Sequence, residues 1–345
     1  MHIMSKLMFV AVGFFAASTG HAKPAMGPAP SMDMEAVLTE LAALGGKPVE
    51  KLTPAQARAG PSPADAAEAV AARMPGKTPT TMAISARDVT YPASAGSLPA
   101  RIYTPAGTRK NRPLIVYYHG GGWVIADIKT YDGGARGIAR NTGAVVVSCE
   151  YRLAPENKFP AAHDDAVACY KWATANAARW GASGKVAIAG ESAGGNLAID
   201  TGIAARDQKL KVPSALLLVY PIAGSDMTTA SYRDSANAAP LSKAGMMWFV
   251  QHVFTTPAAS KDPRIDVYKS AKLAGLPPTI IINAAADPLR SDGELLAAAL
   301  DRAKVNTVRK VYPGTTHEFF GMDAVVANAA AAQKFAGAEL GKHLK

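Results

Sequence analysis

The sequence predicts an α/β fold built on a mostly parallel sheet of about eight strands, with helices on both faces. Short apolar stretches alternate with helical ones after residue 114, which is typical of strands joined by helical crossovers. Two glycine-rich motifs, at 119–122 and at 190–195, each follow one of the predicted strands. The chain of 345 residues is long enough for one elaborated α/β domain or two ordinary ones.

The first 22 residues form a separate element. Lys6 precedes an apolar stretch at 7–17, and Gly20 and Ala22 place small residues at positions −3 and −1 of a cleavage site. This arrangement predicts a secretory signal peptide over 1–22, so we expect the protein to be exported, and to be periplasmic or secreted after cleavage near Ala22. The apolar stretch is too short to span a bilayer comfortably, and we therefore expect no stable membrane insertion.

The rest of the chain divides into a core and two stretches that interrupt its pattern. We expect the core at 81–224 and 271–345, with the first two strands forming an antiparallel hairpin. The stretch at 23–80 is alanine-rich and helical with Pro and Gly breaks, and the stretch at 225–270 includes a helix at 242–254. The predicted strands are 83–90, 98–104, 114–119, 144–149, 185–190, 214–220, 279–283 and 305–312.

The motif at 190–195, Gly-Glu-Ser-Ala-Gly-Gly, contains the pattern Gly-x-Ser-x-Gly. In this pattern the serine sits on a tight strand-to-helix turn with its hydroxyl exposed. A serine between glycines is often only a turn residue, but here a predicted strand leads in and a predicted helix at 196–205 follows. Ser192 is therefore the candidate nucleophile.

The motif at 119–122, His-Gly-Gly-Gly, follows the apolar strand predicted at 114–118. The end of that strand would bring three glycine amides to the same edge of the sheet as Ser192. Glycine clusters after strands are often only turns, yet the two motifs in this order favour an oxyanion loop followed by a nucleophile. We expect His119 to brace this loop through hydrogen bonds.

An activated serine needs a histidine as its base and a carboxylate to hold that histidine. Asp287 leaves the predicted strand at 279–283, and His317 follows the predicted strand at 305–312. The order Ser, Asp, His is that of an α/β-hydrolase fold rather than of a chymotrypsin or subtilisin fold. Asp292 and Glu294 suit the start of the next helix better and rank below Asp287. Asp262 and Asp266 are the other candidates for the carboxylate that holds His317. The histidines at 163, 252 and 343 are expected to have surface or capping roles.

With these motifs in order, the chain resembles bacterial members of the hormone-sensitive-lipase family of esterases, the α/β-hydrolase fold-3 group. The resemblance covers the chain from about residue 32 to its end. Glu191 departs from the pattern, because aspartate is the commoner family residue there; an acidic side chain is kept, and the change bears on how the neighbouring loop is braced. The matching motifs are those at 119–123, 151–156, 159–162, 164–165, 190–195, 287–289 and 317–320.

The resemblance implies that 23–80 and 225–270 pack together as a cap over the site. It also implies an oxyanion hole made by the backbone amides of Gly121, Gly122 and Ala193. Amides aimed at a developing alkoxide stabilise the transition state more than the ground state. Trp123, Trp248 and Phe249 are candidates for the wall of an acyl-binding pocket, with plain packing as the alternative.

We hypothesise that Ser192 attacks an ester carbonyl while His317, oriented by Asp287, accepts its proton and passes it to the leaving alcohol. Water then releases the acyl group. The capped pocket implies short- to medium-chain acyl esters as the small-molecule substrates. An amidase or deacetylase would use the same triad, whereas a non-catalytic receptor on this fold would lack the histidine.

Composition excludes several other classes. The net charge is +10, but lysine and arginine do not form runs with interleaved aromatic residues, so nucleic-acid binding is not expected. No motif in the chain points to a metal or a nucleotide, and we expect no cofactor. The protein is expected to be a monomer or a homodimer. Cys149 and Cys169 are expected to be a buried pair of thiols, with a disulfide as the alternative that export would permit.

Overall fold

The computed structural model describes residues 28–74, 84–107 and 111–345, and the predicted signal peptide over 1–22 lies outside them. All eight predicted strands are present, each within a few residues of its expected bounds. They are β1 (Ile84–Ala93), β2 (Gly96–Pro105), β3 (Leu114–Tyr118), β4 (Val145–Cys149), β5 (Val186–Glu191), β6 (Ala215–Val219), β7 (Thr279–Ala286) and β8 (Thr307–Thr316).

The strands form one sheet in the order β1-β2-β4-β3-β5-β6-β7-β8. As predicted, β1 and β2 form an antiparallel hairpin, and all pairs from β4 to β8 are parallel. Strands β3 to β6 are buried along their whole length, as expected for parallel strands that are covered on both faces. Because these strands point the same way, the carboxyl ends of β3, β5, β7 and β8 meet at one edge of the sheet.

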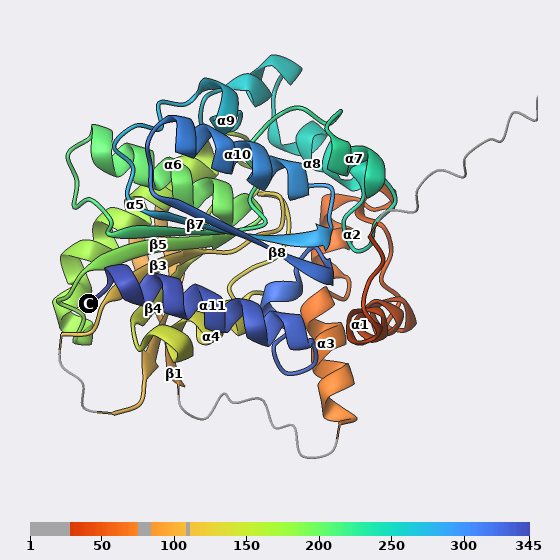
Figure 1. Ribbon diagram of the computed structural model, residues 1–345, viewed down its shortest axis with the longest axis horizontal. Coiled ribbons are helices and arrows are strands. Elements are labelled where there is room, and N and C mark those ends of the chain that lie inside the picture. The colour runs from red at the N-terminus through yellow and green to blue at the C-terminus, as the bar shows by residue number, and fades with distance from the viewer. Residues whose placement is uncertain (1–27, 75–83, 108–110) are drawn as a thin grey trace, which may run out of the picture.

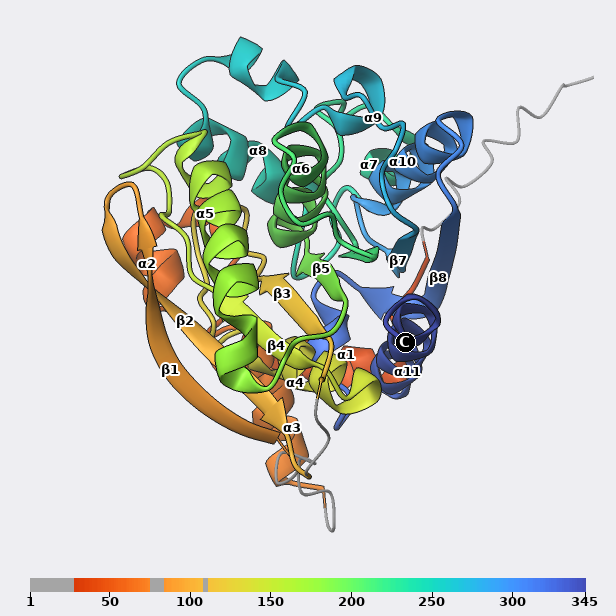
Figure 2. The same ribbon diagram turned by 90° about the vertical axis from the view of Figure 1, so that its left-hand side faces the viewer.

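Helices cover both faces of the sheet, and each face has its own cluster of buried apolar side chains (Figures 1 and 2). On one face lie α4 (Asp132–Thr142) and α11 (Ala327–His343). On the other face lie α5 (Ala161–Asn176), which continues into η3 (Ala177–Trp180), α6 (Ala193–Asp207) and α10 (Arg290–Arg302). The α/β-hydrolase fold expected from the motif order is therefore confirmed.

Two helical segments stand outside this alternation, as predicted, and they contact each other. The indole nitrogen of Trp248 in the second segment donates a hydrogen bond to the Leu52 carbonyl oxygen in the first, at 3.0 Å. The first segment and the part of the second at 230–253 lie at the right-hand end of the molecule in Figure 1, toward which β7 and β8 point, whereas the end of the second segment, at 257–270, lies at the top. The first contains α1 (Met32–Ala43), η1 (Val49–Lys51), α2 (Pro54–Ala59) and α3 (Pro63–Ala72); the second contains α7 (Ala230–Asp234), α8 (Lys243–Val253), η4 (Pro257–Lys261) and α9 (Val267–Ser270).

The two cysteines form a disulfide, so the expectation of a free thiol pair is wrong. Both are fully buried, as expected, because Cys149 ends β4 and Cys169 lies on α5. Their Cα atoms are 6.5 Å apart, which is within the separation that a disulfide bridges. The bond therefore ties α5 to the sheet.

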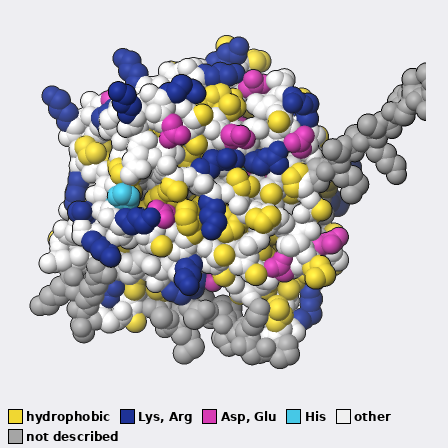
Figure 3. Space-filling model, viewed as in Figure 1, with side chains coloured by type: hydrophobic (Ala, Val, Ile, Leu, Met, Phe, Trp, Pro, Cys, Tyr) yellow, Lys and Arg dark blue, Asp and Glu magenta, His cyan; other side chains and the backbone are white. Residues whose placement is uncertain are grey.

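On the face shown in Figure 3, neither charged nor apolar side chains dominate the surface of the described residues. Lysine, arginine, aspartate and glutamate side chains are mixed there with apolar ones. No helix in the described part of the chain is long and apolar enough to cross a membrane.

Candidate active site

Ser192 occupies a sharp turn between β5 and α6. Its φ is +58°, a backbone conformation that residues with side chains rarely adopt. An added side-chain carbon at Gly190 would overlap the Gly194 carbonyl, so the turn can close only with glycine at that position. The Ser192 amide donates to the Val219 carbonyl oxygen at 2.9 Å, which fixes the turn against β6. The strand-turn-helix that the motif predicts is present.

The three residues expected to form a triad lie together at the carboxyl edge of the sheet. The Ser192 hydroxyl donates to His317 Nε2 at 2.9 Å, and His317 Nδ1 donates to Asp287 Oδ2 at 2.8 Å. Asp287 follows β7 and is fully buried, and its other oxygen accepts the Leu289 amide at 2.8 Å. Since a carboxylate only accepts hydrogen bonds, Asp287 fixes the His317 proton on Nδ1 and leaves Nε2 free to receive the serine proton.

The surroundings of His317 favour its protonated form. Burial alone would lower the pKa of His317, but the Asp287 carboxylate, with further contributions from Glu318 and Glu191, raises this pKa above its usual 6.5. The imidazolium that forms when the serine is deprotonated is therefore stabilised by the site.

Three backbone amides were expected to form the oxyanion hole. Within the described residues, the amides of Gly121, Gly122 and Ala193 donate to no protein acceptor. Ala193 is the first residue of α6, where the amide has no partner inside the helix. These three amides therefore have no protein partner, and their binding of an oxyanion stays a prediction.

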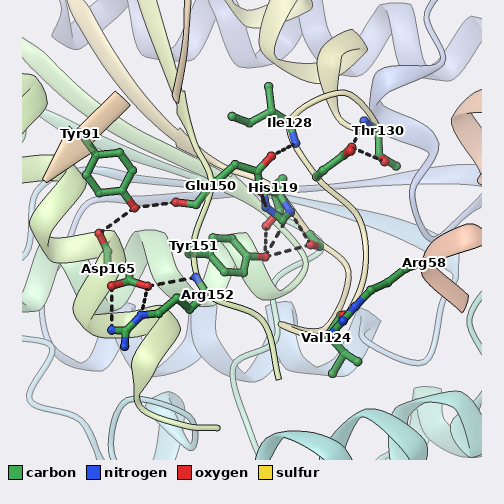
Figure 4. A network of polar contacts seen from close by, with 12 residues as sticks. Arg58, Tyr91, His119, Val124, Ile128, Thr130, Glu150, Tyr151, Arg152 and Asp165 are labelled. Atoms are coloured by element: carbon green, nitrogen blue, oxygen red, sulfur yellow. Dashed lines mark hydrogen bonds and ion pairs between the residues drawn. The ribbon is translucent and has the colours of Figure 1, made fainter. Parts of the chain in front are cut away.

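The glycine loop is held from behind by its neighbours (Figure 4). His119 Nδ1 lies 2.8 Å from the Gly120 carbonyl oxygen, and Nε2 lies 3.2 Å from Glu150 Oε2. The Tyr151 hydroxyl donates to the His119 carbonyl at 2.9 Å, and its ring stacks on the imidazole at 4.3 Å between centroids. The predicted bracing role of His119 is confirmed. Arg58, from the first helical segment, donates to the Val124 carbonyl at 2.8 Å and so anchors that segment to the loop.

Glu191 lies directly beneath the nucleophile and is almost fully buried. It accepts hydrogen bonds from the hydroxyls of Tyr117, at 2.5 Å, and Tyr220. Burial raises the pKa of Glu191 to about 7, although these two hydrogen bonds oppose the change. The sequence predicted an acid that braces the neighbouring loop, but its two tyrosine partners come from β3 and from the end of β6 and carry no motif.

The other candidate acids contact groups other than His317. Asp292 accepts the amides of Ala223 and Gly224, and Asp262 pairs with Arg264 at 3.0 Å. Asp266 accepts a hydrogen bond from the Ser225 amide. Glu294 lies 4.0 Å from Arg309. Asp287 is therefore the carboxylate that the structure brings to His317.

His163 was expected to have a surface or capping role, and this expectation is wrong. Its side chain is buried, and Nε2 lies 2.9 Å from Asn196 Oδ1 on α6. Burial lowers the pKa of His163 to about 4, so it is neutral at physiological pH. It sits at the start of α5, where the sequence alone does not reveal that α6 covers it. His252, by contrast, bonds the Trp248 carbonyl near the end of α8, in a capping role.

Of the three candidate pocket residues, Phe249 lines the cavity between the two helical segments, whereas Trp123 and Trp248 do not. This cavity has a volume of about 870 Å³, and its lining includes Phe249 and Glu318. Trp248 lies behind Phe249, at 5.1 Å between ring centroids. Trp123 is buried, packs against His163 at 5.8 Å, and is not among the residues that line this cavity.

No group of three or more histidine, cysteine or acidic side chains among the described residues is arranged to hold a metal ion. The polar groups at this edge are instead arranged around a serine hydroxyl.

A buried Ser-His-Asp triad at the carboxyl edge of this sheet, with free amides beside the serine, defines a serine hydrolase of the α/β-hydrolase fold. A family model described as the alpha/beta hydrolase fold matches residues 115–321, and the chain belongs to this family, which includes the hormone-sensitive-lipase-like esterases. The chain is a serine hydrolase of the carboxylesterase class.

Known esterases resemble the chain in sequence and in structure. It is 38% identical over 247 residues to carboxylic ester hydrolase LipN of Mycobacterium tuberculosis, a match that covers 69% of this chain but just under two thirds, 65%, of LipN. Carboxylesterase NlhH of the same organism is 37% identical over 240 residues, or 68% of this chain and 75% of NlhH. The crystal structure of a Pyrobaculum calidifontis esterase superposes with a TM-score of 0.79 at 33% identity, covering 91% of this chain and 98% of that one.

Proposed function

We propose that the protein hydrolyses short- to medium-chain acyl esters through an acyl-enzyme formed on Ser192. The observation that carries the proposal is the continuous hydrogen-bonded chain from Ser192 Oγ through His317 to Asp287. No other described histidine bonds a serine hydroxyl in this way.

In the first half of the reaction, Ser192 Oγ attacks the ester carbonyl carbon as its proton moves to His317 Nε2. The carbonyl oxygen becomes an oxyanion, which the amides of Gly121, Gly122 and Ala193 stabilise; each such donor contributes about 3 to 4 kcal/mol. His317 then gives its proton to the departing alkoxide, and the carbon–oxygen bond to the alcohol breaks. In the second half, His317 takes a proton from water, the resulting hydroxide attacks the acyl group, and Ser192 regains its proton.

The two helical segments are proposed to act as a cap that limits the length of the acyl chain. Three features support this role. The segments are joined through Trp248 and Leu52, Arg58 anchors the first of them to the glycine loop, and the cavity between them is lined in part by Phe249, whose ring lies beside Gly122. The apolar side chains in the wall of this cavity, such as Leu52 and Phe249, favour an acyl chain.

We also propose that the protein acts outside the cytoplasm. The amino-terminal pattern at 1–22 supports this proposal, and the disulfide between Cys149 and Cys169 is of the kind that persists in oxidising compartments.

The test is hydrolysis of p-nitrophenyl acetate, butyrate, octanoate and palmitate, and of p-nitroacetanilide, by the protein and by its Ser192→Ala variant. We expect activity that peaks at or below octanoate, is much weaker on the anilide, and is lost in the variant. Activity that peaks at palmitate would contradict the chain-length proposal, and a preference for the anilide would indicate an amidase. Activity that survives Ser192→Ala would contradict the mechanism.

A further inference from the structure

Glu318 directly follows His317 in a backbone conformation that is unfavourable for it. Its φ is +68°, in the left-handed region where residues with side chains cost about 1 to 2 kcal/mol more than glycine. Left-handed backbone at a residue other than glycine persists only where the surrounding structure imposes it, and it is frequent at functional sites. The contacts of the Glu318 carboxylate show what imposes it here.

The carboxylate of Glu318 accepts a hydrogen bond from the Tyr131 hydroxyl at 3.0 Å. Tyr131 precedes α4 and is buried. Its hydroxyl lies so close to Gly120 that an added side-chain carbon at Gly120 would overlap it. One tyrosine hydroxyl therefore contacts both the loop that carries the base and the loop that carries the oxyanion amides.

Glu318 also borders both cavities at this end of the molecule. Glu318 is among the residues that line the cavity of about 870 Å³ between the helical segments, and a second cavity of about 380 Å³, between α3 and α4, is lined by both Glu318 and Glu191. Glu318 therefore lines both the cavity proposed for substrate and the second cavity. A side chain that only filled space would not need to be ionisable at this place.

We propose that Glu318 is a positioning residue for ester hydrolysis: through the Tyr131 hydroxyl it holds the His317 loop against the glycine loop, and its negative charge stabilises the protonated His317. The inference rests on the proposed roles of Ser192 and His317. It assigns functions to two side chains, Glu318 and Tyr131, that lie outside the triad and the oxyanion hole.

The charged and titratable groups around His317 determine how the proposal can be tested. Asp287 faces the ring from the loop after β7, Glu191 from the end of β5, and Tyr220 from the end of β6, with its ring 4.6 Å away. Glu318 is the remaining acid, and it contributes to the raised pKa of His317. Removing its charge should therefore lower the pKa of His317. It should also lower the pKa of Glu191, which Glu318 raises, so both changes move the acid limb of the pH profile in the same direction.

Two substitutions separate the charge from the contact. Glu318→Gln keeps an oxygen that can accept the Tyr131 hydroxyl but removes the charge. Tyr131→Phe keeps the charge but removes the hydroxyl. The matched controls are Glu294→Gln, which neutralises an exposed carboxylate on α10, and Tyr170→Phe, which removes a tyrosine hydroxyl that donates to the Lys211 carbonyl away from the site.

The experiment measures kcat and KM for p-nitrophenyl butyrate from pH 5 to 9, together with thermal unfolding. We expect Glu318→Gln to move the acid limb of kcat/KM to lower pH by a few tenths of a unit or more, while Glu294→Gln leaves the limb in place. We expect Tyr131→Phe to lower kcat on the plateau by about tenfold, with KM changed less than about twofold, because it loosens interactions that matter only in the transition state. Tyr170→Phe should not lower kcat.

Two results would overturn the inference: an acid limb of Glu318→Gln that coincides with that of the unsubstituted protein, or a kcat of Tyr131→Phe equal to that of Tyr170→Phe. Should Tyr131→Phe fail to fold, Glu318→Gly removes the same contact while relieving the left-handed backbone. It should lower kcat without lowering the unfolding temperature, and an unchanged kcat would overturn the inference. The Ser192→Ala variant separates a failure of the proposed role of Glu318 from a failure of the proposed function, because activity that survives this substitution contradicts the proposed function itself.

Discussion

Gly122 offers a quantitative test of how the glycine loop is positioned. An added methyl carbon at Gly122 would stand less than 3.0 Å from three atoms of the Phe249 ring, whereas carbon atoms normally pack at about 3.5 to 4.0 Å. Phe249 is buried and packed edge-on against Trp248, so the ring cannot move aside without disturbing α8. We therefore expect Gly122→Ala to displace the loop by several tenths of an ångström to about 1 Å.

The cost of that displacement follows from the oxyanion amides. A misplacement of about 1 Å in a positioned group costs about a hundredfold in rate, and loss of one oxyanion donor costs about a hundred- to a thousandfold in kcat. Gly122 also has a φ of +57°, which adds strain to any substitution there. We predict that Gly122→Ala lowers kcat for p-nitrophenyl butyrate by about a hundredfold with little change in KM.

Phe249→Ala provides the control for this reasoning. If the ring is what the new methyl group strikes, Gly122→Ala should cost about tenfold less in a Phe249→Ala background than in the unsubstituted protein. The assay is a double-mutant cycle on kcat. A kcat of Gly122→Ala within about threefold of the unsubstituted protein, or an equal loss in both backgrounds, would refute the reasoning.

Three further predictions concern the triad, the disulfide and a buried acid. Asp287→Asn should lower kcat by about a thousandfold to ten-thousandfold, because the amide no longer fixes the His317 proton on Nδ1; a loss below tenfold would contradict this role. Reducing the Cys149–Cys169 bond, which spans 20 residues, should lower the free energy of unfolding by about 3 kcal/mol, and coincident urea curves with and without reductant would show otherwise. Burial raises the pKa of Asp200 to about 7, so its contribution to stability is complete below its unfolded pKa and is lost as the pH rises through 7. Asp200→Asn should therefore raise the free energy of unfolding at pH 8 but not at pH 4, and an equal effect at both values would count against the raised pKa.

The residues that sequence analysis identified well are those with strong local signals. Apolar stretches marked the central strands of the sheet from β3 to β7, and the helix predicted at 242–254 is present as α8. Ser192, Asp287 and His317 could be ranked because parallel strands deliver their carboxyl ends to one edge, which turns chain order into spatial proximity. Gly190 likewise indicates a tight turn, because its backbone lies so close to the Gly194 carbonyl that no larger residue fits there.

The features that sequence analysis missed depend on which surfaces meet. His163 looks like an exposed residue at a helix start, and only the packing of α5 against α6 buries it against Asn196. The two cysteines were judged by burial alone, whereas their bonding depends on the distance between a strand and the helix that follows it. Tyr131 lies in no motif, and the motif at 317–320 does not reveal that Glu318 contacts a residue 187 positions away in the chain.

The acyl-enzyme is the central claim, and it can be observed directly. Mixing the protein with p-nitrophenyl butyrate, quenching in acid during turnover and mapping peptides by mass spectrometry should reveal one butyryl group per chain, on the peptide that contains Ser192. The same experiment on Ser192→Ala should give none. An adduct on another residue, or hydrolysis without any adduct under conditions in which release of the acyl group is slow, would contradict the account.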